Sequence, residues 1–143
     1  MFPIFLNGAL DGLGPKRSDA PEGRFPPAPD SVPAARRFVL DVGWSEDSEL
    51  NLRLATLVSE IVTNAVLHAR TPFTVKVLPT EQTIRVSVSD GSTALPIKKK
   101  YEATQPTGRG LHIVEATADR WGISPRARGK TIWFELDRVG ASV

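Results

Sequence analysis

The clearest hydrophobic pattern in the chain lies between about Asp47 and Ala69. Apolar residues recur there every three or four positions, at Leu54, Leu57, Val58, Ile61 and Ala65. This spacing places them on one side of a helix, so it predicts one long helix that packs on a core. Polar residues typical of a helix start precede it, namely Ser45, Asp47 and Ser48.

Two further helices are predicted on either side of this one. Residues Ala34–Val42 have helical periodicity, and Ser31 is a plausible N-cap for them. Another helix begins at Gly108-Arg109-Gly110 and continues to Ala118.

Four stretches have the alternation of apolar and polar residues that indicates strands. They are Phe73–Leu78, Thr83–Ser89, Arg120–Ser124 and Thr131–Leu136. The first two are joined by the short connector Pro79–Gln82, which favours an antiparallel hairpin.

These elements predict an α+β fold, a two-layer sandwich of helices on a mainly antiparallel sheet. The length of 143 residues suits one domain, which we assign to residues 33–143. Residues 1–32 contain many prolines and glycines without an apolar period, so we predict a disordered leader. A polar loop over Gly91–Thr107 is unusually long and is predicted to be functional or mobile.

Charge and composition exclude several classes of function. The 18 basic and 16 acidic side chains are dispersed, apart from Lys98-Lys99-Lys100, so no direct nucleic-acid partner is expected. The chain has no cysteine, which excludes disulfides and thiolate metal sites. No stretch reads as a secretory signal or a membrane span, so we expect a cytoplasmic protein without a membrane partner.

Three polar residues of the long helix could form a site. Glu60, Asn64 and His68 are four positions apart and fall on one stripe beside the apolar face. Asn64 could offer a neutral oxygen to Mg²⁺, and Glu60 could orient or deprotonate a hydroxyl. The alternative is a solvated edge of the helix, with His68 interacting only with the helix dipole.

Two glycine-containing segments could complete such a site. Asp90, at the end of a strand, can accept a hydrogen bond from an exocyclic amine such as that of adenine, and Gly91 lets backbone approach a flat ring. The alternative is a plain turn. Gly108-Arg109-Gly110-Leu111 opens a helix whose free N–H groups could face phosphate oxygens, although no Walker or dinucleotide motif is present.

The order of these features resembles the GHKL ATPase superfamily and its Bergerat fold. SEIVTNAVLHA at Ser59–Ala69 is similar to the N-box of the anti-sigma factor serine/threonine kinases. GRGLHIV at Gly108–Val114 resembles their second glycine box, and GKTIWFEL at Gly129–Leu136 resembles their closing strand. The resemblance covers residues 34–137.

The resemblance implies that the domain binds ATP and Mg²⁺, and it assigns roles to the candidate residues. Asn64 would ligate the Mg²⁺ ion, and Glu60 would be the general base. Asp90 would bind the adenine amine, with Gly91 beside it and Thr131 in support.

The same resemblance implies the phosphate side of the site. It would be lined by Gly108, Arg109, Gly110 and Leu111, and His68 would lie near the phosphates. The loop 91–107 would be an ATP lid. The lysines at 98–100 either hold phosphates or form a solvated cluster.

The function implied is that of a serine/threonine kinase that regulates transcription. It would phosphorylate an antagonist protein of the STAS type, sequester a sigma factor, or do both, and a homodimer is compatible with the family. One departure favours an alternative: the usual box DxGxG is replaced by Asp90-Gly91-Ser92-Thr93, which lacks one residue and one glycine. The alternative is a non-catalytic, nucleotide-dependent protein-binding switch.

A third reading, a detached ATPase part of a sensor kinase, is disfavoured. The only histidines are His68 and His112, and neither lies in a phosphoacceptor helix.

Overall fold

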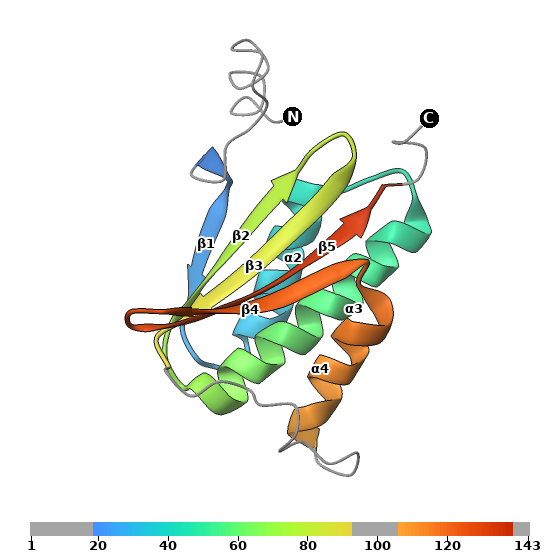
Figure 1. Ribbon diagram of the computed structural model, residues 1–143. Coiled ribbons are helices and arrows are strands. Elements are labelled where there is room, and N and C mark those ends of the chain that lie inside the picture. Colours follow the sequence, from blue (N-terminus) through green and yellow to red (C-terminus); the bar gives the residue numbers. More distant parts are fainter. Residues whose placement is uncertain (1–18, 93–105, 139–143) are drawn as a thin grey trace.

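The protein folds into one sheet covered on one face by helices. A computed structural model describes residues 19–92 and 106–138. The elements in chain order are β1 (Glu22–Phe25), α2 (Ser31–Gly43), α3 (Ser48–Asn64), η2 (Ala65–Ala69), β2 (Phe73–Pro79), β3 (Thr83–Asp90), α4 (Pro106–Thr117), β4 (Arg120–Arg126) and β5 (Gly129–Asp137). Figure 1 shows the helices α2, α3 and α4 on one side of the sheet. The predicted α+β sandwich is confirmed.

The sheet has five strands in the order β1-β2-β3-β5-β4, and every neighbouring pair is antiparallel. The predicted hairpin is the pair β2 and β3, in which Val75 lies opposite Val88. Alternate residues of β2, β3 and β5 are buried, as the period of two requires when one face of a sheet is covered.

The core lies between this buried face and α3. Leu54, Leu57, Val58 and Ile61 of α3 are fully buried and belong to the same cluster as Val86 and Phe134 of the sheet. Asp47 caps α3, because its side chain accepts hydrogen bonds from the backbone N–H groups of Glu49 and Leu50.

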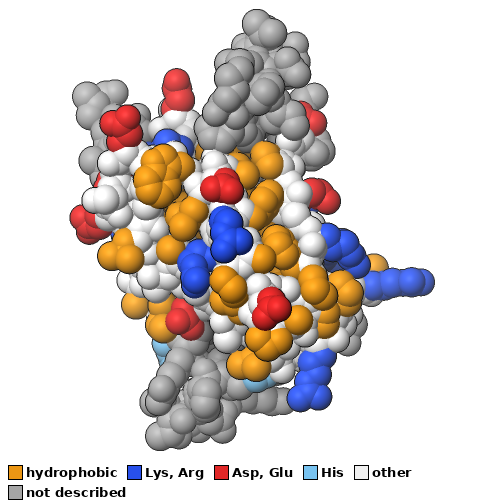
Figure 2. All heavy atoms as spheres, turned by 180° about the vertical axis from the view of Figure 1, so that it is seen from behind, with side chains coloured by type: hydrophobic (Ala, Val, Ile, Leu, Met, Phe, Trp, Pro, Cys, Tyr) orange, Lys and Arg blue, Asp and Glu red, His pale blue; other side chains and the backbone are white. Residues whose placement is uncertain are grey.

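The outer surface of the helical layer carries apolar as well as charged side chains. Figure 2 shows hydrophobic side chains gathered among the charged ones over this face. Within the described part of the chain, the large hydrophobic side chains that are exposed are Trp44, Leu52 and Leu67. Extended exposed apolar surface is typical of a contact with another macromolecule.

The assignment of residues 1–32 to a disordered leader is wrong for its second half. Residues 22–25 form the edge strand β1, which pairs with β2. The ring of Phe25 lies 5.7 Å from the ring of Phe73 and 6.2 Å from that of Phe38, measured between centroids. The two prolines that follow Phe25 obscured this short strand in the sequence. The first 18 residues lie outside the described part of the chain.

Ser31 is not an N-cap, because its hydroxyl donates to the carbonyl oxygen of Pro26. It is the first residue of α2, after Asp30. The hydrogen bond fixes the turn that carries the chain from β1 into α2.

The long helix predicted over 47–69 changes its geometry near its end. It is α-helical from Ser48 to Asn64 and continues as a π-helical turn, η2, from Ala65 to Ala69. Arg70, in a left-handed conformation with φ 58°, ends it. Single π-turns of this kind occur often at functional sites, and this one begins directly after Asn64.

The combined helix Ser48–Ala69 is long and apolar enough to cross a membrane by length and composition alone, contrary to the expectation from the sequence. Many of its apolar residues, among them Leu54, Leu57, Val58 and Ile61, belong to the core that it forms with the sheet, whereas Leu52 and Leu67 are exposed. The core helix of an α+β fold meets the same criterion, and that is the position of this helix.

The start of β5 and the end of β3 form a tight corner, in which the two backbones lie very close together. Gly129 has φ +132°, and a Cβ atom placed on it would lie 1.9 Å from the carbonyl oxygen of Asp90. Only glycine fits there, because a side chain would be strained by φ and would also collide with backbone.

We predict that Gly129→Ala lowers the free energy of unfolding by about 1–3 kcal/mol or more, through this strain and collision. Urea denaturation measures the change. Gly91→Ala is the matched control, because its Cβ would meet the Thr71 side chain at an ordinary 3.5 Å. Equal losses in the two variants would contradict the special role of Gly129.

Candidate functional site

Helix α3 carries Glu60 and Asn64 one turn apart, and both side chains are half-buried. The neighbouring Ser59 forms its hydrogen bonds with other residues. Its hydroxyl donates to the carbonyl oxygen of Ala55 and accepts from the guanidinium of Arg36, 2.9 Å away. Ser59 therefore ties α3 to α2, whereas Glu60 and Asn64 take no part in that link.

Asn64 has a buried polar atom that lacks a partner in the described structure. Its Nδ2 is the one buried side-chain nitrogen or oxygen among the described residues without a hydrogen bond. Leaving such an atom unpaired costs about 1–3 kcal/mol, so native proteins rarely do so without a reason. A ligand that engages the carboxamide would remove this cost.

Asp90 lies at the end of β3 and is almost fully buried. Its Oδ1 accepts a hydrogen bond from the Lys130 ammonium at 3.0 Å and another from the backbone N–H of Ser92 at 2.9 Å. The side chains of Lys130 and Asp90 are 6% and 2% exposed, so this ion pair is shielded from water. The carboxylate already has a charged donor from its own chain.

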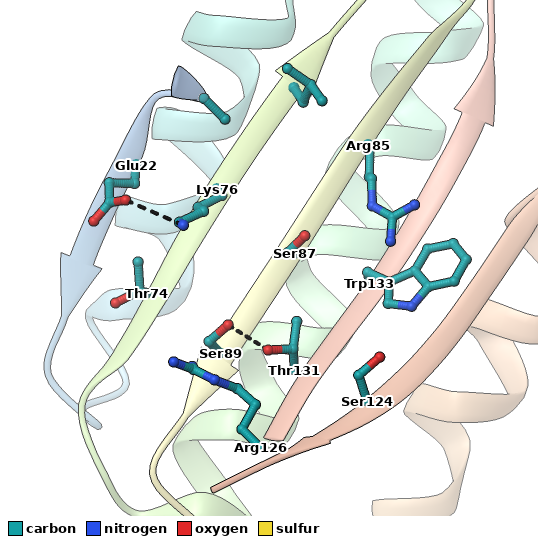
Figure 3. A pocket seen from close by; sticks show the side chains of 12 residues that line it. Glu22, Thr74, Lys76, Arg85, Ser87, Ser89, Ser124, Arg126, Thr131 and Trp133 are labelled. Atoms are coloured by element: carbon teal, nitrogen blue, oxygen red, sulfur yellow. Dashed lines mark hydrogen bonds and ion pairs between the residues drawn. The ribbon is translucent and has the colours of Figure 1, made fainter. Parts of the chain in front are cut away.

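Lys130 is the residue that sequence reasoning missed, and Thr131 is the one it misplaced. Thr131 was expected to support Asp90, but the two face opposite sides of the sheet. Its hydroxyl is 2.7 Å from that of Ser89 on the open face, as Figure 3 shows. The alternation of β5 was the available signal, since Lys130 shares a face with the buried Ile132 and Phe134.

The turn after Asp90 is fixed by a second hydrogen bond. The backbone N–H of Gly91 donates to the hydroxyl of Thr71, 2.8 Å away. The Asp90–Gly91 corner is therefore held from three elements, namely β3, β5 and the segment after η2.

His68 lies on the π-helical turn and is exposed. Partial burial, then the positive charges of Arg70 and Lys130, hold its pKa below the ordinary histidine value. Because folding favours neutral His68, this contribution to stability is present above the unfolded-state pKa of about 6.5 and is lost as the pH falls from there through the lowered folded-state pKa.

The glycines of the second motif lie in α4. This helix begins at Pro106, two residues before the expected start at Gly108, so Gly108, Arg109, Gly110 and Leu111 belong to its first turns. Proline suits the first turn of a helix, where its missing N–H has no intrahelical acceptor. Helix α4 packs beside α3. The predicted lid lies largely outside the described residues, and so do Lys98–Lys100.

The open face of the sheet carries a hollow of about 520 Å³, separate from the helical side (Figure 3). Among its lining residues, Arg85 lies over the Trp133 ring and bonds to Glu135 at 2.9 Å. Desolvation raises the pKa of Glu135, but hydrogen bonds from Arg120 and Arg85 outweigh it and hold the pKa below its usual value. This face carries a structural charge network.

A resident metal ion would need ligands from a bound molecule. The described residues contain no group of three or more histidine, cysteine, aspartate or glutamate side chains that could hold one. Mg²⁺ is commonly bound through one or two protein oxygens together with substrate phosphates and water. The carboxamide oxygen of Asn64 would be a ligand of that kind, whereas Oδ1 of Asp90 already accepts from Lys130 and from the backbone of Ser92.

Comparison with known proteins gives one match. A sequence model of the histidine kinase-like ATPase domain matches residues 25–136, which is most of the chain. No curated protein matches the chain.

We predict that Lys130→Met lowers the free energy of unfolding by about 3–5 kcal/mol, because it leaves the Asp90 carboxylate buried and unpaired. Adding Asp90→Asn should restore much of the loss, and a double-mutant cycle in urea measures the coupling. Lys76→Met is the matched control. Lys76 pairs with Glu22 at 3.7 Å in solvent, so its loss should cost less than about 1 kcal/mol. An equal cost at both lysines would contradict the importance of the buried pair.

Proposed function

Because the chain belongs to the family of histidine kinase-like ATPase domains, we propose that it is a cytoplasmic regulatory protein of the anti-sigma factor kinase type. It binds ATP with Mg²⁺. It phosphorylates a STAS-type antagonist protein, sequesters a sigma factor, or does both. Family membership supports the binding of the nucleotide. The resemblance of the N-box and of the glycine box supports the assignment to the anti-sigma factor kinase type.

The observation that carries the proposal is the buried Nδ2 atom of Asn64, which has no hydrogen-bond partner among the described residues and lies one helical turn from Glu60. A carboxamide can turn its oxygen toward a hard cation, and Mg²⁺ accepts such neutral oxygen ligands beside phosphate. Helix α3 is the core helix, so the position of Asn64 is fixed before any ligand arrives. Such preorganisation lowers the cost of binding.

Glu60 supplies the acid–base chemistry in this proposal. Its side chain has no hydrogen-bond or ion-pair partner among the described residues, unlike that of the neighbouring Ser59. Its carboxylate would orient the acceptor hydroxyl and take its proton. Bound Mg-ATP would supply the phosphoryl group and the charge neutralisation that transfer requires.

The proposed partner is a protein, and no direct contact of this chain with nucleic acid is expected. The charges of the chain are nearly balanced, at net +2, which argues against an electrostatic nucleic-acid surface. The exposed hydrophobic side chains on the helical layer, among them Trp44 and Leu52, support a protein partner or a second copy of the chain (Figure 2).

A second candidate function is a nucleotide-dependent binding switch without catalysis. It is favoured by the ion pair of Asp90 with Lys130 and by the glycine missing after Gly91. In this case the domain would capture its partner equally well without the carboxylate of Glu60.

We predict that Mg-ATP binds the wild type and that Asn64→Ala weakens binding at least about tenfold, which is about 1.4 kcal/mol. Isothermal titration calorimetry measures both affinities, with and without Mg²⁺. Thr56→Ala is the control, because Thr56 is exposed on the same helix. An Asn64→Ala protein that binds Mg-ATP as tightly as the wild type would remove Asn64 from the site.

We predict that Glu60→Gln slows phosphoryl transfer to a STAS-type antagonist by about 10²–10⁴-fold, because the general base is lost. The affinity for Mg-ATP should stay within about twofold, since glutamine keeps the shape of the side chain. Transfer of radiolabelled phosphate measures the rate, and Glu49→Gln, in the first turn of the same helix, is the control.

The same variants separate the two candidate functions. If the wild type transfers no phosphate, and Glu60→Gln captures the partner as well as the wild type does, the switch replaces the kinase.

A further inference from the structure

The hollow on the open face of the sheet lies on the opposite side from the helix that carries Glu60 and Asn64 (Figures 1 and 3). Its volume of about 520 Å³ is in the range of pockets that hold small molecules. The apolar side chains among its lining residues are Ala20, Leu78 and Trp133, and the others are polar or charged. The hollow is therefore suited to a polar ligand.

One row of polar side chains crosses all five strands at one end of this face. Strand register places its members side by side in the order Arg24, Thr74, Ser89, Thr131 and Ser124. All of them except Arg24 carry a hydroxyl group. The hydroxyls of Ser89 and Thr131 lie 2.7 Å apart, so one donates to the other and the acceptor keeps its own hydrogen for a further bond. The row therefore offers hydrogen-bond donors to a ligand in the hollow.

The positive charges of this face are paired with acids at one end only. At the end far from the hydroxyl row, Arg85 and Arg120 both pair with Glu135. Near the row, the side chain of Arg126 has no hydrogen-bond or ion-pair partner within the described ranges. The guanidinium of Arg24 donates there to a neutral threonine hydroxyl and to no acid. The hydroxyl end of the face therefore has an excess of positive charge.

Arg126 brings a charged donor to the hydroxyl row. Figure 3 shows its side chain reaching from β4 toward Ser89 and Thr131. The donors then come from three strands and do not lie in one plane. A phosphate group presents oxygens in several directions and suits such a set, whereas a carboxylate has two oxygens in one plane. Guanidinium groups are also well matched to phosphate.

We propose that the hydroxyl–arginine site, defined as Ser89, Ser124, Arg126 and Thr131, binds the phosphate group of a small molecule. The remaining volume of the hollow leaves room for the rest of that molecule. This inference is independent of the proposed function, because no residue of the N-box or of the second glycine box lines the hollow. A second copy of the chain is a poorer occupant, since the centres of such interfaces are apolar and depleted in charge.

The test titrates pyrophosphate, without Mg²⁺, into the wild type and Arg126→Gln by calorimetry. We expect Arg126→Gln to weaken binding at least about tenfold, because the charged donor is lost. Arg128→Gln is the matched control. It removes the same charge from the same hairpin, but Arg128 does not line the hollow, so the affinity should change less than about twofold. Equal losses in the two variants would reveal unspecific attraction and overturn the proposal.

Ser124→Ala tests the hydroxyl row at constant charge. Ser124 is exposed and its hydroxyl has no partner among the residues that the structure describes, so its loss should leave the fold intact. We expect pyrophosphate to bind at least about threefold more weakly, because a donor to a charged group is removed. An unchanged affinity would contradict the proposed site.

Malonate, a compact dicarboxylate, tests the preference for phosphate. Malonate that binds as tightly as pyrophosphate overturns the proposal, and so does a wild type that binds no pyrophosphate at about 10 mM. Ribose 5-phosphate separates the two sources of the group. Tighter binding of this ester assigns the site to a phosphorylated metabolite, and tighter binding of pyrophosphate assigns it to a free phosphate ion.

Nuclear magnetic resonance locates the bound pyrophosphate on the unaltered protein. We expect the backbone amide signals of Ser89, Ser124 and Thr131 to shift. Shifts confined to α3 and α4 would place the anion in the proposed nucleotide site and overturn the inference. Sedimentation tests the other occupant, because a wild-type dimer that Arg126→Gln dissociates would assign this face to a second copy of the chain.

Discussion

The buried ion pair between Asp90 and Lys130 joins the two central strands of the sheet at the edge of the candidate site. It is shielded from water, and it lies beside a corner where only Gly129 fits. The positive charge of Lys130 also contributes to lowering the pKa of His68 on the π-helical turn. The ends of β3 and β5 are thereby held together at one carboxylate. Removing either partner would leave a buried charge, so the pair constrains the stability of this corner.

Helix α3 supplies the other half of the site. Its apolar face is fixed in the core, and the change to π-helical geometry begins directly after Asn64, whose amide is buried without a described partner. The two halves differ in their polar contacts. The Nδ2 atom of Asn64 has no hydrogen-bond partner among the described residues, whereas the Asp90 carboxylate is paired with Lys130. Family membership supports nucleotide binding.

The sequence predicted the fold well where periodicity is strong. The helix with Leu54 to Ala65 and the hairpin of β2 and β3 are where the pattern placed them. The edge strand β1 was missed because four residues beside prolines carry no usable period, and its place depends on contacts of Phe25 that are distant in sequence. The π-turn was missed because α and π geometry share the same apolar pattern over so few residues.

The functional roles of the candidate site residues stay predictions, and the structure adds where their side chains lie. Glu60 and Asn64 follow from helical spacing, and Asp90 from its place at a strand end. The role of Lys130 could have been found from the alternation of β5, which puts it with Ile132 on the buried side and Thr131 on the open side. Its bond to Asp90 depends on the register of two strands about forty positions apart, which local pattern does not give. The most direct test is a crystal structure of the full chain with Mg²⁺ and a non-hydrolysable ATP analogue. We predict a metal contact from the Asn64 carboxamide oxygen, and an analogue bound away from Asn64 would contradict this account.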